Sequence, residues 1–193
     1  MKQRIQQQLP YISYGQMNLL INFRNLWLDL ATWTRNYIAR VMSGWGGVGE
    51  VGERLYEIPV DFYNRLQLIF GEQQSQGFLD LLSQHIILMM TIADSLKKND
   101  TQGVNTGVSQ LYQNAIQIAS FLERLNPFWN GIQWKSLFDN YINMTLEEMV
   151  ALASNNFARD IDIYDRIAYH TVFLADFMTN GIIQYASIRG SNQ

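Results

Sequence analysis

Apolar residues recur along most of the chain at alternating steps of three and four, the spacing of an amphipathic α-helix. No segment shows the sustained alternation and hairpin turns that mark strands. The pattern therefore predicts an all-α protein. We expect helices over residues 16–43, 51–70, 72–98, 101–125, 134–155 and 157–187.

Helix-breaking residues separate these stretches. A glycine-rich run over residues 44–49 ends the first helix, and Gly71 ends the second. The turn at 99–101 offers Asp100 or Thr101 as the cap of the following helix. Pro59 falls inside the second stretch, where we expect it either to kink the helix or to start a new one.

Long helices joined by short loops pack as an up-and-down antiparallel helix bundle. We expect a single domain over residues 1–193, with four long helices plus short additional helices. Residues 1–15 are expected to be a flexible or docking N-terminal segment. The expected core contains Phe23, Leu30, Trp33, Leu82, Leu88, Tyr141, Leu174 and Phe177.

Charged residues make up only 16% of the chain, against about 25% in an average protein, while aromatic residues reach 13%. A chain rich in amide and aromatic side chains resembles one whose surface is covered by other subunits. We therefore expect a non-catalytic structural or scaffold protein that self-assembles or docks on a protein partner. Trp45, Phe128 and Trp129 lie in predicted loops and are the interface candidates. A dimer, a closed ring and a filament all remain open.

Several classes of function are disfavoured. The net charge of −3 argues against a nucleic-acid binder. The absence of cysteine excludes disulfides and thiolate metal sites. Because no run approaches 18 uninterrupted apolar residues, we expect no membrane-spanning helix. The polar N-terminus lacks a signal-peptide core, which favours the cytoplasm and leaves export by a non-classical route open.

The two histidines, His85 and His170, both lie on apolar helical stripes and are the main candidates for site chemistry. Such a residue is usually a hydrogen-bonded core histidine. The alternative adds Glu148, which shares a face with apolar residues of its own helix, and gives a two-histidine, one-carboxylate metal site. Such a site would hold iron, manganese or zinc; otherwise we expect no cofactor. We expect no catalytic residue, and Arg24 and Arg35 are interpreted as ordinary surface charges near Asp29.

Short strings over residues 22–186 resemble a family of small all-helical bacterial proteins of unassigned function, whose pattern is similar to hemerythrin-like and ferritin-like bundles. The matching strings are Leu26-Trp27, Trp33-Thr34-Arg35, Tyr37-Ile38, Leu81-Leu82-x-x-His85-Ile86, Asn114-Ala115-x-x-Ile118-Ala119-x-Phe121-Leu122, Asn126-Pro127, Thr145-x-x-Glu148 and Ala175-Asp176-x-x-x-x-Gly181-Ile182.

The resemblance implies inward-facing histidines at four places. This chain keeps two of them, His85 and His170, and has Leu30 and Tyr141 at the other two places. Leucine cannot bind a metal, and a neutral tyrosine is a poor ligand at pH 7. Leu30 and Tyr141 are therefore expected to line a pocket whose metal site is lost or weakened, which favours the non-catalytic role.

Overall fold

The computed structural model describes residues 12–190, and within this range the chain forms helices and no strand. The helices are α1 (Tyr14–Ser43), α2 (Val48–Phe70), α3 (Glu72–Lys97), α4 (Thr101–Leu125), α5 (Gly131–Ala153) and α6 (Phe157–Gly190). The all-α class and each predicted helix are confirmed, with ends that differ by at most three residues. The N-terminal segment expected over residues 1–15 lies mostly outside the described residues, and its last part already belongs to α1.

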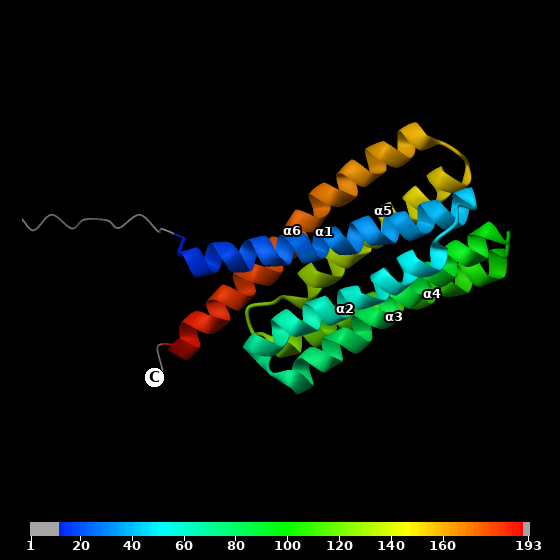
Figure 1. The fold of residues 1–193 in the computed structure, drawn as a ribbon. Coiled ribbons are helices and arrows are strands. Elements are labelled where there is room, and N and C mark those ends of the chain that lie inside the picture. Colours follow the sequence, from blue (N-terminus) through cyan, green and yellow to red (C-terminus); the bar gives the residue numbers. More distant parts are fainter. Residues whose placement is uncertain (1–11, 191–193) are drawn as a thin grey trace, which may run out of the picture.

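The helices described here are all long, from 23 residues in α2 and α5 to 34 in α6. The expected division into four long helices and short additions is therefore not confirmed. Figure 1 shows the α1–α2, α3–α4 and α5–α6 turns at one end, and the α2–α3 and α4–α5 turns at the other. Helices adjacent in sequence pack together, and α1 also packs against α3, α5 and α6, which makes it the central element.

Side chains at the helix ends explain where the helices begin and end. Ser13 and Gln16 form a capping box at the start of α1, each accepting a hydrogen bond from the other's backbone N–H. Asp100 accepts from the N–H of Gly103, so of the two predicted caps Asp100 is confirmed. Gly44 has a φ of 72°, a left-handed conformation that glycine adopts without strain, and it ends α1.

Pro59 lies inside α2, which continues through it to Phe70. No new helix begins at this residue. Proline lacks the N–H that would bond the carbonyl four residues earlier, so the ladder loses one bond there. Pro59 is itself buried, together with its neighbour Ile58. The tertiary packing of α2 offsets the local cost of the proline.

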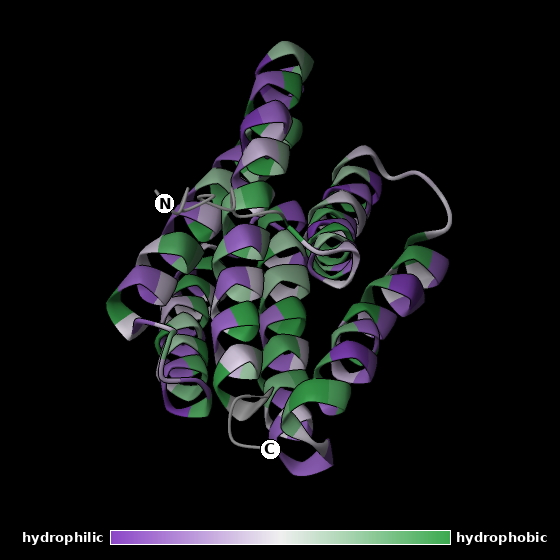
Figure 2. Ribbon diagram, turned by 90° about the vertical axis from the view of Figure 1, so that its left-hand side faces the viewer, coloured by the Kyte–Doolittle hydropathy of each residue, from purple (hydrophilic) through white to green (hydrophobic). Residues whose placement is uncertain are grey.

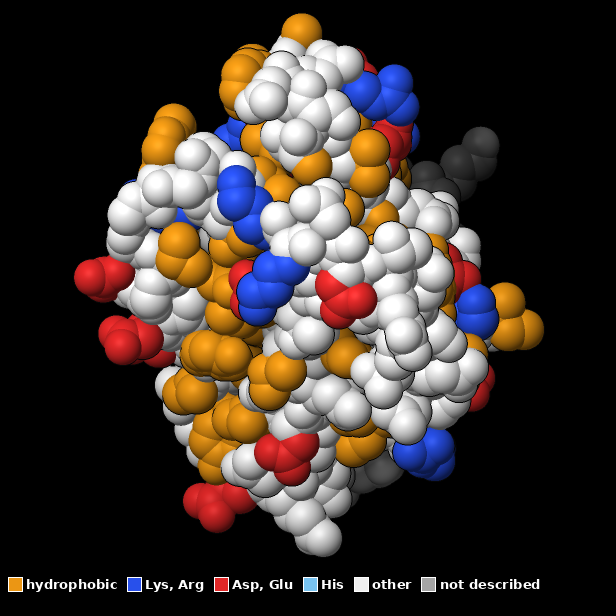
Figure 3. All heavy atoms as spheres, turned by 90° about the vertical axis from the view of Figure 1, so that its right-hand side faces the viewer, with side chains coloured by type: hydrophobic (Ala, Val, Ile, Leu, Met, Phe, Trp, Pro, Cys, Tyr) orange, Lys and Arg blue, Asp and Glu red, His pale blue; other side chains and the backbone are white. Residues whose placement is uncertain are grey.

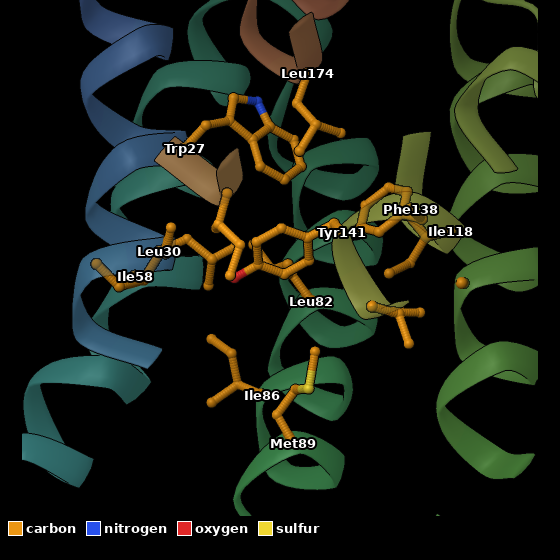
Figure 4. Packing of buried hydrophobic residues seen from close by; sticks show 14 of the residues in the cluster. Trp27, Leu30, Ile58, Leu82, Ile86, Met89, Ile118, Phe138, Tyr141 and Leu174 are labelled. Atoms are coloured by element: carbon orange, nitrogen blue, oxygen red, sulfur yellow. The ribbon is translucent and has the colours of Figure 1, made fainter. Parts of the chain in front are cut away.

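Aromatic and aliphatic side chains pack together in the centre of the protein (Figure 4). The ring of Trp27 meets those of Phe62 and Phe138 edge-on, at centroid distances of 5.0 and 5.8 Å. Most of the predicted core is confirmed as buried. Trp33 and Phe177 are only partly buried, and the Arg54 guanidinium lies 5.6 Å from the Trp33 ring.

The helices carry both hydrophobic and hydrophilic residues (Figure 2), as expected of amphipathic helices that bury one side and expose the other. Figure 3 shows one face on which backbone and uncharged side chains cover much of the surface, with apolar side chains between them and scattered charged groups. Among the described helices, α3 is long and apolar enough to cross a membrane by length and composition. Its apolar side chains Leu82, Ile86 and Met89 are buried against other helices, as in the core helix of a folded protein.

Candidate functional site

His85 lies in the core on α3. It is fully buried, and its Nδ1 lies 3.0 Å from the side-chain oxygen of Asn114 on α4. Burial lowers the pKa of His85 to about 4, although the Asn114 contact opposes this shift. The imidazole is therefore neutral at pH 7. Its Nε2 has no partner among the described residues.

His170 lies elsewhere, half-buried between α5 and α6. Its Nε2 is 2.8 Å from the carbonyl oxygen of Leu137, so this nitrogen carries a proton and donates. Burial lowers the pKa of His170, and the Leu137 carbonyl partly offsets this effect. The ring lines a surface groove of about 280 Å³ with Met144, Tyr169 and Phe173. The His170 side chain therefore bonds to the backbone and faces a surface groove, not the core of the bundle.

The three candidate metal ligands, His85, Glu148 and His170, do not form one group. Glu148 is buried beside Arg35, while each histidine has a different partner. Within residues 12–190, no three His, Asp or Glu side chains are placed to hold a metal ion. Binding of iron, manganese or zinc stays a prediction without a described ligand set, and elemental analysis of the purified protein would test it.

Leu30 and Tyr141 lie where the resemblance places a former metal pocket. Both are 1% exposed, and Figure 4 shows the Tyr141 hydroxyl directed towards Leu30 among apolar side chains. Burial raises the pKa of Tyr141, so the phenol stays protonated. These two side chains take part in a packed core.

A buried ionic cluster joins α1, α5 and α6. Arg35 donates to both oxygens of Asp160, from Nη2 at 2.5 Å and from Nε at 3.3 Å. The same Nε lies 3.3 Å from Oε1 of Glu148, and the guanidinium stacks 4.8 Å from the Tyr164 ring centre. We call Arg35, Glu148 and Asp160 the ionic cluster. The Glu148 and Asp160 side chains are 1% and 4% exposed, so two carboxylates share one arginine away from water.

Glu148 is the most perturbed acid of this cluster. Burial, together with the nearby charge of Asp160, raises its pKa to about 8, although the positive charge of Arg35 opposes the shift. Its Oε1 has no hydrogen bond within the described chain despite the nearby guanidinium. At pH 7 Glu148 is therefore mostly protonated, and the charge of Arg35 is balanced by Asp160.

This cluster was not predicted from sequence, where Arg35 was interpreted as a surface charge near Asp29. Arg24 is likewise paired across helices, with Asp176 of α6. Both partners are more than a hundred residues away in sequence, beyond the reach of helical spacing rules. One signal was available: Glu148 lies on an apolar face, where a carboxylate requires a partner.

A pocket of about 360 Å³ opens above the ionic cluster. Arg35 and Asp160 line it, while Trp45 and Phe157 contribute large side chains that are 66% and 58% exposed. The α1–α2 turn carries Trp45, and Phe157 begins α6. The pocket thus lies at the end of the molecule where the α1–α2 and α5–α6 turns meet the ionic cluster.

The three predicted interface residues differ in exposure. Trp45 is exposed, and Phe128 is half-buried. Trp129 is only 1% exposed: its indole N–H donates to the carbonyl of Met178 at 3.2 Å, and a Cβ on Gly181 would overlap the ring. Its prediction as an interface residue is wrong, because the chain folds this loop back onto α6.

A second apolar surface was not predicted. Tyr169 and Phe173 are 68% and 48% exposed on α6, and their ring centroids are 5.2 Å apart, edge to face. Ile161 lies two turns earlier on the same helix and is also exposed. The i,i+4 spacing of Tyr169 and Phe173 in the sequence could have indicated this pair.

Comparisons with protein-family models, with curated protein sequences and with solved structures returned no match. The resemblance to hemerythrin-like and ferritin-like bundles therefore stays a prediction.

Proposed function

We propose that this protein is an up-and-down helix bundle that serves as a non-catalytic scaffold and associates with a second copy of itself through the outer face of α5 and α6. We define this α5–α6 face by Met144, Ile161, Tyr169 and Phe173. The observation that supports it best is the exposed Tyr169–Phe173 pair beside the groove lined by Met144. Exposed apolar groups gathered beside a groove are typical of a protein–protein contact.

The charges on this face favour a second copy as the partner. Arg159 and Arg166 both pair with Glu147, at 2.5 and 3.5 Å, so the two cations lie against one anion. A two-fold contact brings a surface against its own copy and so penalises strong uncompensated charge. Because Glu147 offsets one of the two arginines, the uncompensated charge of this group is small. This also agrees with the low charge content of the chain.

The dimensions of α6 are sufficient for such a contact. Its 34 residues give a helix about 51 Å long. A stable interface buries about 800 Å² on each partner. The outer side of one long helix, with the adjoining groove of α5, provides a surface of this order.

Sedimentation velocity over a concentration series tests the proposal. The unmodified chain should show a dimer or a larger assembly at high concentration. The double variant Tyr169→Ser/Phe173→Ser should weaken association at least about tenfold, which corresponds to 1.4 kcal/mol. The matched control is Leu68→Ser/Ile132→Ser, which removes two even more exposed side chains, 79% and 81%, from α2 and α5.

A chain that stays monomeric at every concentration would contradict self-association. An equal loss of association in the control variant would show that the α5–α6 face has no special role. Recovery of a different protein bound through Tyr169 and Phe173, without a dimer, would replace the second copy by a docking partner.

A further inference from the structure

The pocket above the ionic cluster has the size of a small-molecule site. Its volume of about 360 Å³ falls within the range of about 300–1,000 Å³ that such sites occupy. Three separate parts of the chain build it: the last turns of α1, the α1–α2 turn with Trp45, and the α5–α6 junction with Phe157. None of these residues belongs to the α5–α6 face defined above.

The walls of the pocket are partly apolar. Met42, Trp45, Leu152 and Phe157 line it with apolar surface, and the two aromatic side chains remain largely in water. Large aromatic groups prefer a partner on their faces or edges. A planar ligand between these walls would remove apolar surface from water on both sides.

The floor of the pocket carries a hydrogen-bond donor in a nearly neutral setting. The Arg35 side chain is 30% exposed, and within the described chain no hydrogen bond engages its Nη1. Asp160 is almost completely buried and holds the other side of the guanidinium. Because burial raises the pKa of Glu148 to about 8, Asp160 alone balances the arginine at pH 7.

This arrangement discriminates between ligand charges. A carboxylate in the pocket would approach Arg35 but also the fixed charge of Asp160. An ammonium or amidinium group would meet the exposed guanidinium directly, which is repulsive. A neutral carbonyl can accept from Arg35 Nη1 without either conflict. The side chains of Asn36 and Asn155 at the wall offer further neutral hydrogen bonds.

We propose that this pocket binds a small uncharged molecule with a planar apolar body and a carbonyl-type acceptor, held between Trp45 and Phe157 and hydrogen-bonded to Arg35. The site is independent of self-association. The titration below should give the same result in the Tyr169→Ser/Phe173→Ser variant.

Three probes of nearly equal shape test the charge argument: benzamide is neutral, benzoate is an anion and benzamidinium is a cation. Binding is followed by the shift of the Trp45 indole N–H signal in two-dimensional NMR, assigned by its loss in Trp45→Ala. Benzamide should bind at least about tenfold tighter than either charged probe. Ligand-detected NMR should show at least about fivefold weaker benzamide binding to Trp45→Ala. Tyr56→Ala, which removes an exposed aromatic side chain of α2, should leave binding unchanged.

Each other outcome overturns the proposal. Tightest binding of benzoate would mean that the floor acts as a cation, and tightest binding of benzamidinium would mean that the carboxylates dominate. Equal affinity for all three probes would mean that the pocket does not select by charge. No binding of benzamide would mean that the pocket does not bind this class of ligand. Unchanged benzamide binding to Trp45→Ala would place the ligand elsewhere.

Discussion

Two Arg–Asp pairs join α1 to α6 with similar geometry and very different surroundings. Arg24 donates to both oxygens of Asp176 at 2.7 and 2.8 Å, and Arg35 donates to both oxygens of Asp160. The side chains of the first pair are 42% and 34% exposed. In the second pair, Arg35 is still 30% exposed, whereas Asp160 is only 4% exposed. The contacts are alike, but water reaches the carboxylate of the first pair and hardly reaches that of the second.

The comparison shows that burial, more than contact geometry, decides what an ion pair does in this fold. Exposed pairs contribute little because water solvates the separated charges nearly as well. A buried pair makes each partner dependent on the other, since a lone charge left inside is strongly destabilising. The buried pair also has a third member, Glu148, whose protonation responds to it.

The largest effect is expected for Arg35→Ala. The variant leaves Asp160 and Glu148 buried without their cation and removes the guanidinium stacked on Tyr164. The free energy of unfolding, measured in urea at pH 8, should fall by about 3 kcal/mol. Arg65→Ala, an exposed arginine on α2, is the control and should change it by less than about 0.5 kcal/mol. A similarly small loss for Arg35→Ala would contradict the argument from burial.

The next effect is a pH dependence caused by Glu148. The folded pKa of about 8 lies above the ordinary value of 4.5, so between these values the folded chain holds a proton that the unfolded chain has released. Stability is therefore highest at low pH for this group and falls as the pH rises, by at most about 1.4 kcal/mol per pH unit. Between pH 6.5 and 8 the loss is about 1.6 kcal/mol.

Glu148→Gln should flatten this part of the stability curve, because a glutamine cannot release a proton. Urea unfolding at half-unit pH steps would measure the slope. Glu147→Gln, which changes the neighbouring and more exposed carboxylate, should leave the slope of stability against pH unchanged. An unchanged slope in Glu148→Gln would show that another group titrates in this window.

His85 provides the opposite pH dependence with no ionic partner. Its folded pKa of about 4 lies below the ordinary 6.5, so stability is present above pH 6.5 and is lost as the pH falls towards 4. Between pH 5 and 6.5 the His85 and Glu148 slopes therefore oppose each other. His85→Gln should uncover a stability that falls with rising pH in this window, by about 1 kcal/mol per pH unit. A curve that still rises would assign the acid loss to other groups, of which the half-buried His170 is the first to replace, by His170→Asn.

The helices of this fold were predictable from sequence because their determinants are local. Apolar spacing located each helix, and Asp100 and Gly44 located turns through their own side chain or backbone. Pro59 left two alternatives open, a kink or a new helix, and α2 continues through it without a new start because packing offsets its local preference. The prediction of short additional helices was also not confirmed, since the shortest helices described, α2 and α5, have 23 residues each.

The candidate site was predictable only in part, because its partners come from distant helices. Glu148 was identified as a carboxylate on an apolar face, but its cation was not. His170 was grouped with it because both lie on apolar stripes, although the side chain turns to the Leu137 carbonyl. Trp129 was likewise misplaced, because a loop position suggests exposure. The side chain is buried only because the tertiary fold packs this loop against α6.

The smallest effect is expected at the exposed pair, and it completes the comparison. Arg24→Ala should lower the free energy of unfolding by about 0.5 kcal/mol, since exposed pairs are worth between zero and about 1 kcal/mol.

A double-mutant cycle with Asp176→Ala isolates the coupling between the two side chains, and the corresponding cycle with Arg35→Ala and Asp160→Ala measures the buried pair. Raising the ionic strength to about 1 M shortens the Debye length to about 3 Å and should remove most of the Arg24–Asp176 coupling. The Arg35–Asp160 coupling should persist to a larger extent, because the Asp160 carboxylate is almost completely buried. Equal couplings, or an equal response to salt, would mean that the hydrogen-bond geometry shared by the two pairs outweighs the difference in burial.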